Sequence, residues 1–220
     1  MTGLLHLDRP WLALDFDQPQ RVLSWAINRP GFVETRRILW REVRNADLPP
    51  DLDVAAWLAD ALRRRESSKA VAFLTSRDIR AYQDATVTID GVTSRCIATV
   101  GLSNAERIGT LMDRTGQNWG TINIAVATAC GLTDAARIEA LSIASQARTV
   151  AVLDAGFDLP TGRATGTGTD CIAIAAPEGN ITYAGLHTAL GAAVGRCVLQ
   201  AVSAGVQEWM TTVKRAEATE

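Results

Sequence analysis

The sequence of 220 residues has little of the chemistry that usually marks a metal or disulfide protein, with only two histidines and four cysteines. The cysteines form no C-x-x-C pair, and their spacing fits neither a zinc site nor a disulfide framework. No histidine or carboxylate spacing is typical of a metal-ligand cluster either, so we expect no metal site. Free cysteines are usually buried, and these are expected to be reduced thiols of a cytosolic protein: Cys96, Cys130, Cys171 and Cys197.

The sequence also lacks a strong charge of one sign and any very long apolar run. Its formal net charge is −2, which gives no support for a nucleic-acid surface or for a patch that binds anionic membranes. No stretch approaches the roughly 20 apolar residues that span a bilayer. The N-terminus has no cationic segment followed by an apolar one, as a secretory signal would. We therefore expect a cytoplasmic protein whose partners include neither nucleic acid nor a membrane.

What is present is ordinary globular composition, with 47% hydrophobic and 21% charged residues. A chain of this length buries roughly 70% of its unfolded surface, which is enough for a core without covalent cross-links. We predict a single domain over residues 1–220, in which the β-rich N-terminal part, residues 1–48, is a candidate subregion.

Hydrophobic periodicity predicts a mixed α+β fold with a largely antiparallel sheet. Helical spacing predicts a shorter helix over residues 52–65 and two long helices over 134–153 and 188–213. Short strands separated by turn residues are expected at residues 4–7, 11–16, 21–27, 35–43, 70–74 and 121–128. Asp90-Gly91 is typical of a two-residue turn, so 85–89 and 92–100 should form a hairpin. A second hairpin is expected from strands 171–176 and 181–184, centred on Gly179.

The segment A-T-G-T-G-T-D, residues 164–170, is too polar for a core and too rich in glycine to order itself. A phosphate-binding P-loop is excluded because no lysine lies nearby, and Cys171 stands where the dinucleotide fingerprint needs glycine. Both motifs also open a helix, whereas this segment leads into a strand. The segment should therefore serve a site of another kind.

The predicted hairpin around Gly179 places Asp170 opposite His187, because residues equidistant from a turn face each other in an antiparallel pair. Thr188 is a natural N-cap of the helix that follows. The positive end of that helix disfavours a charged imidazole, while a neighbouring carboxylate favours it. The hypothesis is a carboxylate–imidazole pair beside the glycine–threonine segment.

The threonine hydroxyls of this segment can orient a substrate amide, donate to a developing oxyanion, or bond to the local backbone. At least one of Thr165, Thr167 and Thr169 is expected to have only the last role. Cys171 is the thiol nearest to His187 and a candidate nucleophile, but its place in an apolar strand favours a packed thiol.

Several motifs together resemble the adenosylcobinamide amidohydrolase (CbiZ) family. They are A-T-G-T-G-T-D-C-I-A-I-A (164–175), Y-A-G-L-H-T-A-L-G-A-A-V-G-R (183–196), G-L-S-N-A-E-R-I-G (101–109), G-T-I-N-I (120–124) and L-T-D-A-A-R-I-E-A-L-S-I-A-S-Q-A-R-T (132–149). They span most of residues 95–200 in order. Gln146 and Arg148 differ from the Glu and Lys that are common in the family at these positions.

The resemblance implies a corrinoid-salvage hydrolase that cuts the aminopropanol amide of adenosylcobinamide, giving adenosylcobyric acid and 1-amino-2-propanol. It implies no cofactor apart from the cobalt corrinoid that is the substrate. With the hairpin geometry, it suggests His187 as general base and later acid, Asp170 as its orienting carboxylate, and Thr167 and Thr169 as hydrogen-bond donors. The expected substrate-binding residues are Ser103, Asn104, Asn123, Thr165, Gly166, Gly168 and Thr188.

Aromatic walls are expected around the corrin ring, and the six tryptophans are candidates. The assignment predicts that His187→Ala folds normally but loses turnover by orders of magnitude.

Two other functions remain open at this point. One is a corrinoid-binding protein without hydrolytic activity, and the other is a self-processing amidohydrolase that exposes an N-terminal threonine after a Gly-Thr step. A homo-oligomer is also possible through the helix face that carries Gly191 and Gly195.

Overall fold

A computed structural model describes residues 2–113 and 119–217 of the protein. Within these residues the strands form an eight-stranded, largely antiparallel sheet in the order β4-β3-β2-β12-β8-β6-β5, with β1 beside β2. Its strands are β1 (Leu4–Asp8), β2 (Trp11–Ser24), β3 (Gly31–Glu42), β4 (Val71–Thr75), β5 (Gln83–Ile89), β6 (Val92–Val100), β8 (Ile122–Thr128) and β12 (Cys171–Ala176).

The helices are α1 (Val54–Arg64), α2 (Asp134–Asp154) and α3 (Ala189–Glu217), with short 3-10 turns η1 (Asn45–Asp47) and η2 (Ile79–Ala81). The predicted class, a mixed sheet packed by two long helices and a shorter one, is confirmed. Two-residue strands pair outside the large sheet: β7 (Ala105–Glu106) with β11 (Gly166–Thr167), and β9 (Asp158–Leu159) with β10 (Gly162–Arg163).

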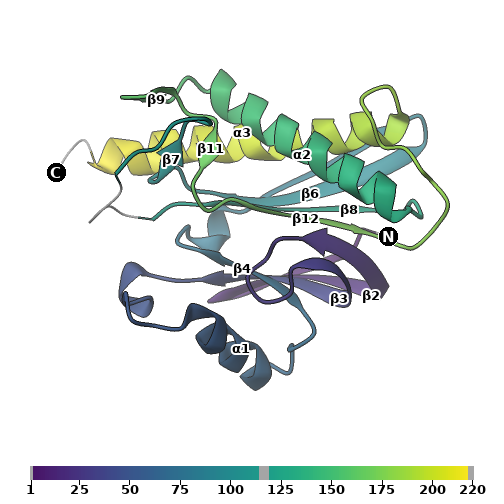
Figure 1. Ribbon diagram of the computed structural model, residues 1–220, viewed down its shortest axis with the longest axis horizontal. Coiled ribbons are helices and arrows are strands. Elements are labelled where there is room, and N and C mark those ends of the chain that lie inside the picture. Colours follow the sequence, from purple (N-terminus) through teal and green to yellow (C-terminus); the bar gives the residue numbers. More distant parts are fainter. Residues whose placement is uncertain (1, 114–118, 218–220) are drawn as a thin grey trace.

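The sheet curls so that its two halves face each other, and Figure 1 shows the resulting layers. Helices α2 and α3 cover the half made of β5, β6, β8 and β12, and α1 lies beyond β2, β3 and β4. Strand β2 joins the halves, since it pairs with β3 along most of its length and with β12 at its C-terminal end. Its pairing with β3 shifts register between Asp15 and Gln20, where a bulge can increase the local twist.

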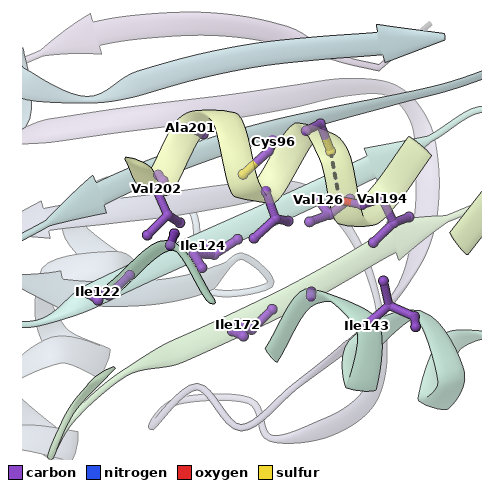
Figure 2. Packing of buried hydrophobic residues seen from close by; sticks show 14 of the residues in the cluster. Cys96, Ile122, Ile124, Val126, Ile143, Ile172, Val194, Ala201 and Val202 are labelled. Carbon is purple, nitrogen blue, oxygen red and sulfur yellow. Dashed lines mark hydrogen bonds between the residues drawn. The ribbon is translucent and has the colours of Figure 1, made fainter. Parts of the chain in front are cut away.

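Three hydrophobic clusters fill the spaces between these layers. The largest lies under α2 and α3, where Ile122, Ile124 and Val126 of β8 and Ile172 of β12 meet residues of both helices (Figure 2). Alternate residues of the same strands face the second cluster, between the two halves of the sheet. The third joins α1 to the outer face of β2, β3 and β4. Strands β8 and β12 are therefore apolar on both faces.

The predicted cap at Thr188 and the predicted turn at Asp90-Gly91 are confirmed. Thr133 caps α2 by accepting from the backbone N–H of Ala136, and the Thr188 hydroxyl accepts from the N–H of Gly191 at the start of α3 (2.9 Å). The β5–β6 hairpin turns at Asp90 and Gly91, both with positive φ. These features depend on neighbouring residues only.

Two strand predictions are wrong because tertiary pairing overrides the local pattern. Residues 11–16 and 21–27 are not separate strands, because β2 continues through the Gln18-Pro19 turn signal as one bulged strand. Residues 181–184 form no strand beside β12, since β12 already has β2 on one side and β8 on the other. Ile181 makes only an isolated bridge to Leu132.

Helix α3 also corrects the expectation that no stretch is apolar enough to cross a bilayer. Residues Ala189–Thr212 reach a mean hydropathy of 1.4 over a window with few charges, which by length and composition suffices for a span. More than half of that window (56%) is buried inside the protein, and the buried apolar residues of α3 pack in the largest hydrophobic cluster. The apolar character therefore follows from its position in the core.

Candidate functional site

One cavity of about 310 Å³ opens at the edge of the two sheet halves, where β2, β3 and β4 end and β8 and β12 begin. Its walls are mostly apolar and include Trp25, Phe73 and Trp119. Asp170 and Cys171, at the end of the glycine–threonine segment, form part of its lining. We call it the apolar cavity.

A second hollow of about 260 Å³ adjoins the apolar cavity and shares five residues with it: Val43, Arg44, Ser76, Trp119 and Gly120. Its remaining lining is more polar and includes Arg77, Asp78 and Ser103. We call it the polar hollow. Segments from both halves of the chain thus meet around one opening.

The carboxylate of Asp170 is the centre of the hydrogen bonds that hold this region together. One oxygen accepts from the backbone N–H of Ile122 (3.0 Å) and from the Thr167 hydroxyl. The other accepts from the Thr167 N–H (3.0 Å) and from the Arg148 guanidinium of α2. Asp170 therefore ties its own loop to β8 and to α2.

These four donors occupy the acceptor capacity of an ionised carboxylate, which has about four lone-pair sites. The Asp170 side chain is only 6% exposed, and that of Arg148 is 17% exposed. Burial raises the pKa of Asp170, while Arg148 and then the Thr167 and Ile122 donors act in the opposite direction. A saturated, buried carboxylate is suited to positioning other groups and has no acceptor site left for a substrate.

The glycines and threonines of the segment serve this carboxylate and its surroundings. A Cβ at Gly166 would lie 1.7 Å from Nη1 of Arg148 and 2.7 Å from Oδ2 of Asp170, so only glycine leaves room for the ion pair. The Thr165 hydroxyl accepts from the Ile108 N–H (2.7 Å), and the Thr169 hydroxyl donates to the Gly120 carbonyl (3.1 Å). Most hydroxyls expected to face a substrate are therefore bonded within the protein.

The loop before β8 packs tightly on the loop after β6. A Cβ at Gly120 would lie 2.6 Å from the backbone nitrogen of Ser103, so the two backbones are in close contact. The amide nitrogen of Asn104 donates to Thr169 (3.3 Å), and that of Asn123 donates to the Leu74 carbonyl (2.7 Å). Among the predicted binding residues, Ser103 lines the polar hollow, and Asn123 lines the apolar cavity.

The predicted contact between Asp170 and His187 is wrong. His187 is exposed, and the Ala184 N–H just before it donates to Glu139 in the first half of α2 (2.6 Å). Asp170 contacts Arg148, nine residues further along the same helix, which is a rise of about 14 Å. The contact fails because 181–184 do not return beside β12, and the catalytic role of His187 remains a prediction without that partner.

Sequence reasoning missed the partner of Asp170 and most of the cavity wall. In the sequence Arg148 stands out only as a departure from the common family residue, although a cation in a largely apolar helix is a signal for a buried acid. Tryptophans were expected as walls, and Trp25 and Trp119 are in that position. The indole N–H of Trp25 also donates to the Asp170 carbonyl (2.7 Å), which joins the wall to the segment.

Cys171 is predicted to be an unreactive thiol, because burial raises its pKa to about 12. At pH 8 only about one molecule in ten thousand would then carry the thiolate that reacts with iodoacetamide. Native alkylation followed by peptide mass spectrometry should label the half-buried Cys130 first and leave Cys171 largely unmodified. Cys130→Ser is the control, and labelling of Cys171 at the rate of Cys130 would contradict the assignment.

The structure is therefore that of an α+β protein with two adjoining hollows that open at the edge of one curled sheet. The sequence matches the adenosylcobinamide amidohydrolase family over residues 4–214, and the chain belongs to that family. An adenosylcobinamide amidohydrolase of Halobacterium salinarum (strain ATCC 700922 / JCM 11081 / NRC-1) is 36% identical over 118 residues. The match covers 50% of this chain and 48% of the relative, so the chain spans about half the length of that relative.

Proposed function

We propose that this protein hydrolyses the aminopropanol amide of adenosylcobinamide, giving adenosylcobyric acid and 1-amino-2-propanol in corrinoid salvage. The family supports the substrate class. The observation that carries the proposal is the pair of hollows at the glycine–threonine segment, one apolar and one polar, which share a single rim. A corrin has broad apolar faces and amide side chains, so it needs both kinds of surface side by side.

The rim of the apolar cavity is unusually apolar for a protein surface. Trp25, Ile27 and Trp119 line it and are 45%, 50% and 55% exposed. Exposed apolar residues that gather at one opening commonly mark a binding site. The flat face of the corrin would lie against these three side chains.

The amide to be cut would then extend into the polar hollow. Water adds to the carbonyl carbon, the C–N bond breaks, and the departing amine takes up a proton, which leaves a carboxylate on the corrin. Arg44 and Ser103 line the hollow, and their guanidinium and hydroxyl groups would donate to the negative charge that develops on the carbonyl oxygen. In this arrangement they are the candidate catalytic groups.

Asp78 also lines the polar hollow, but its chemistry suits binding better than proton transfer. Hydrogen bonding from the Arg80 side chain, as the largest cause, lowers its pKa to about 2. The carboxylate is therefore ionised at neutral pH and is a weak base. It would accept a hydrogen bond from the hydroxyl or the ammonium group of aminopropanol.

Asp170, Thr167 and Thr169 act in this proposal as positioning residues. They hold the 120–122 backbone, of which Gly120 lines both hollows, against α2 and the 101–104 loop. Loss of their hydrogen bonds would displace the groups that face the substrate, without removing any group that reacts.

The test is to incubate the purified protein with adenosylcobinamide in the dark and to quantify adenosylcobyric acid and aminopropanol by liquid chromatography and mass spectrometry. Release of both products in equal amounts is the expected result. Tight binding without release would favour the non-catalytic corrinoid-binding protein. An intact mass below that of the full chain, ending at a Gly-Thr step, would favour self-processing.

The same assay distinguishes the two placements of the catalytic groups. Because His187 is exposed and lines neither hollow, we expect His187→Ala to keep its turnover within about twofold, which is under 0.5 kcal/mol in the barrier. Arg44→Ala should lower turnover by about a hundredfold, as for loss of one donor to an oxyanion. If His187→Ala loses turnover and Arg44→Ala keeps it, the catalytic role belongs to His187 instead.

A further inference from the structure

We propose that the apolar cavity binds the adenosyl group of the corrinoid, the upper axial ligand of the cobalt. This inference rests on the proposed function, because it assumes that an adenosylated corrinoid is the substrate. It assigns to the cavity a role in selecting that axial ligand, separate from the hydrolysis in the polar hollow.

The size of the cavity is the first argument. At about 310 Å³ it lies at the lower end of the range for ligand pockets, about 300–1,000 Å³. That space fits a group the size of a nucleoside but not a corrin macrocycle with its amide side chains. The macrocycle must therefore remain outside, on the exposed side chains of Trp25, Ile27 and Trp119.

The shape of the ligand is the second argument. An axial ligand projects perpendicular to the corrin plane, whereas the amide side chains extend from the edge of the ring. A ring that lies flat on the rim would thus insert its axial ligand into the cavity beneath it. Its edge would pass over Val43, Arg44 and Ser76, the boundary shared with the polar hollow. One orientation thereby fills both spaces.

The lining is the third argument, because it fits a neutral aromatic group. Phe73 lies in the wall beneath the rim, where a flat base can stack on its ring. The Asn123 amide nitrogen donates to Leu74, which leaves its oxygen to accept from an adenine amino group. The Ser76 hydroxyl donates to the Trp119 carbonyl (2.6 Å), so its oxygen can accept from a ribose hydroxyl.

Charge and shape argue against two other occupants of the apolar cavity, a phosphate group and the aminopropanol amide. A phosphate would meet the Asp170 carboxylate, whose cationic partner Arg148 is already engaged, and Arg44 would be its one cation in the lining. A thin polar side chain such as the aminopropanol amide would leave the aromatic walls unfilled. Both are suited to the polar hollow instead.

The experiment measures binding of a corrinoid that is not hydrolysed, so that it does not depend on turnover. Equilibrium dialysis in the dark would compare adenosylcobyric acid with the same corrinoid that carries water in place of the adenosyl group. We expect the wild-type protein to bind the adenosylated form at least about tenfold more tightly, as for 1.4 kcal/mol. Free 5′-deoxyadenosine should compete with it.

Leu48→Trp fills the cavity from its lining and is the variant that tests the assignment. It should reduce the preference to about twofold or less, with affinity for the aqua form unchanged within about twofold. Leu186→Trp, at an exposed residue that lines neither hollow, is the matched control and should keep the preference.

Equal affinity of the wild type for both corrinoids, without competition by 5′-deoxyadenosine, would overturn the inference even if the protein hydrolyses cobinamide. A preference that survives in Leu48→Trp would also overturn it. A preference abolished by Leu48→Trp, in a protein that releases no aminopropanol, would support the inference and refute the proposed hydrolysis. The competition experiment needs no variant, so it tests binding of the adenosyl group even if Leu48→Trp does not fold.

Discussion

Asp170→Asn should lower the free energy of unfolding by about 3–5 kcal/mol, the usual cost of removing one partner from a buried ion pair. The substitution replaces one carboxylate oxygen by an amide NH2 group. That group would face either Arg148 and the Thr167 N–H, or the Ile122 N–H and the Thr167 hydroxyl. It also leaves the Arg148 guanidinium buried without its counter-charge. Denaturation by urea, followed by circular dichroism, measures the change.

The matched control for this prediction is Asp158→Asn. Asp158 also pairs with an arginine, Arg163, at 3.8 Å, but the two side chains are 78% and 60% exposed. An exposed pair contributes at most about 1 kcal/mol. Equal losses in the two variants would show that the Asp170–Arg148 pair does not hold the fold, and the positioning role would be abandoned.

Turnover of Asp170→Asn should fall further than its folded fraction. The Ile122 N–H loses its bond to the carboxylate, so the nearby residue Gly120, which lines both hollows, is less firmly held and the reacting groups are then misplaced. Activity measured where the variant is fully folded separates this effect from unfolding. Full activity under that condition would indicate a role in stability alone.

Gly166→Ala should have the second-largest effect, about 1–3 kcal/mol, which is typical of an added methyl group in a filled space. The new Cβ would overlap the Arg148 guanidinium and come within 2.7 Å of the Asp170 carboxylate. The arginine end is flexible, but moving it breaks the ion pair. Chemical denaturation and the hydrolysis assay should both report the loss.

Gly168→Ala is the control, two residues further along the same segment. Its nearest neighbours would be 4.0 Å from the added Cβ, which is ordinary contact, so its stability should change by no more than about 0.5 kcal/mol. The double variant Gly166→Ala with Asp170→Asn should cost less than the two changes added, since both break one ion pair. Additive losses would show that the glycine is needed for another reason.

Features that depend on near neighbours in the chain were predictable. The β5–β6 hairpin, the cap at Thr188 and the three helices follow from turn residues, a capping hydroxyl and periodicity. The motifs that resemble the family also identified the segment that lines the cavity. These signals depend on residues that are only a few positions apart in the sequence.

The strands that pair with β12 were not predictable from such local signals. Its residues, C-I-A-I-A-A, are apolar at every position, which is typical of a central strand covered on both faces. Such a strand carries no alternation to show which strand pairs with it, and the prediction chose a hairpin because that partner was nearest. The structure pairs it with β2 and with β8 instead.

The sequence by itself determined the helices, the local turns, the family and the unusual polarity of residues 164–170. Only the tertiary structure decided that Asp170 contacts Arg148 rather than His187, and that two hollows meet beside it. The physical reason is that local structure comes from hydrogen bonds and sterics between close residues. The site comes from the packing of two sheet halves, which brings together segments more than a hundred residues apart.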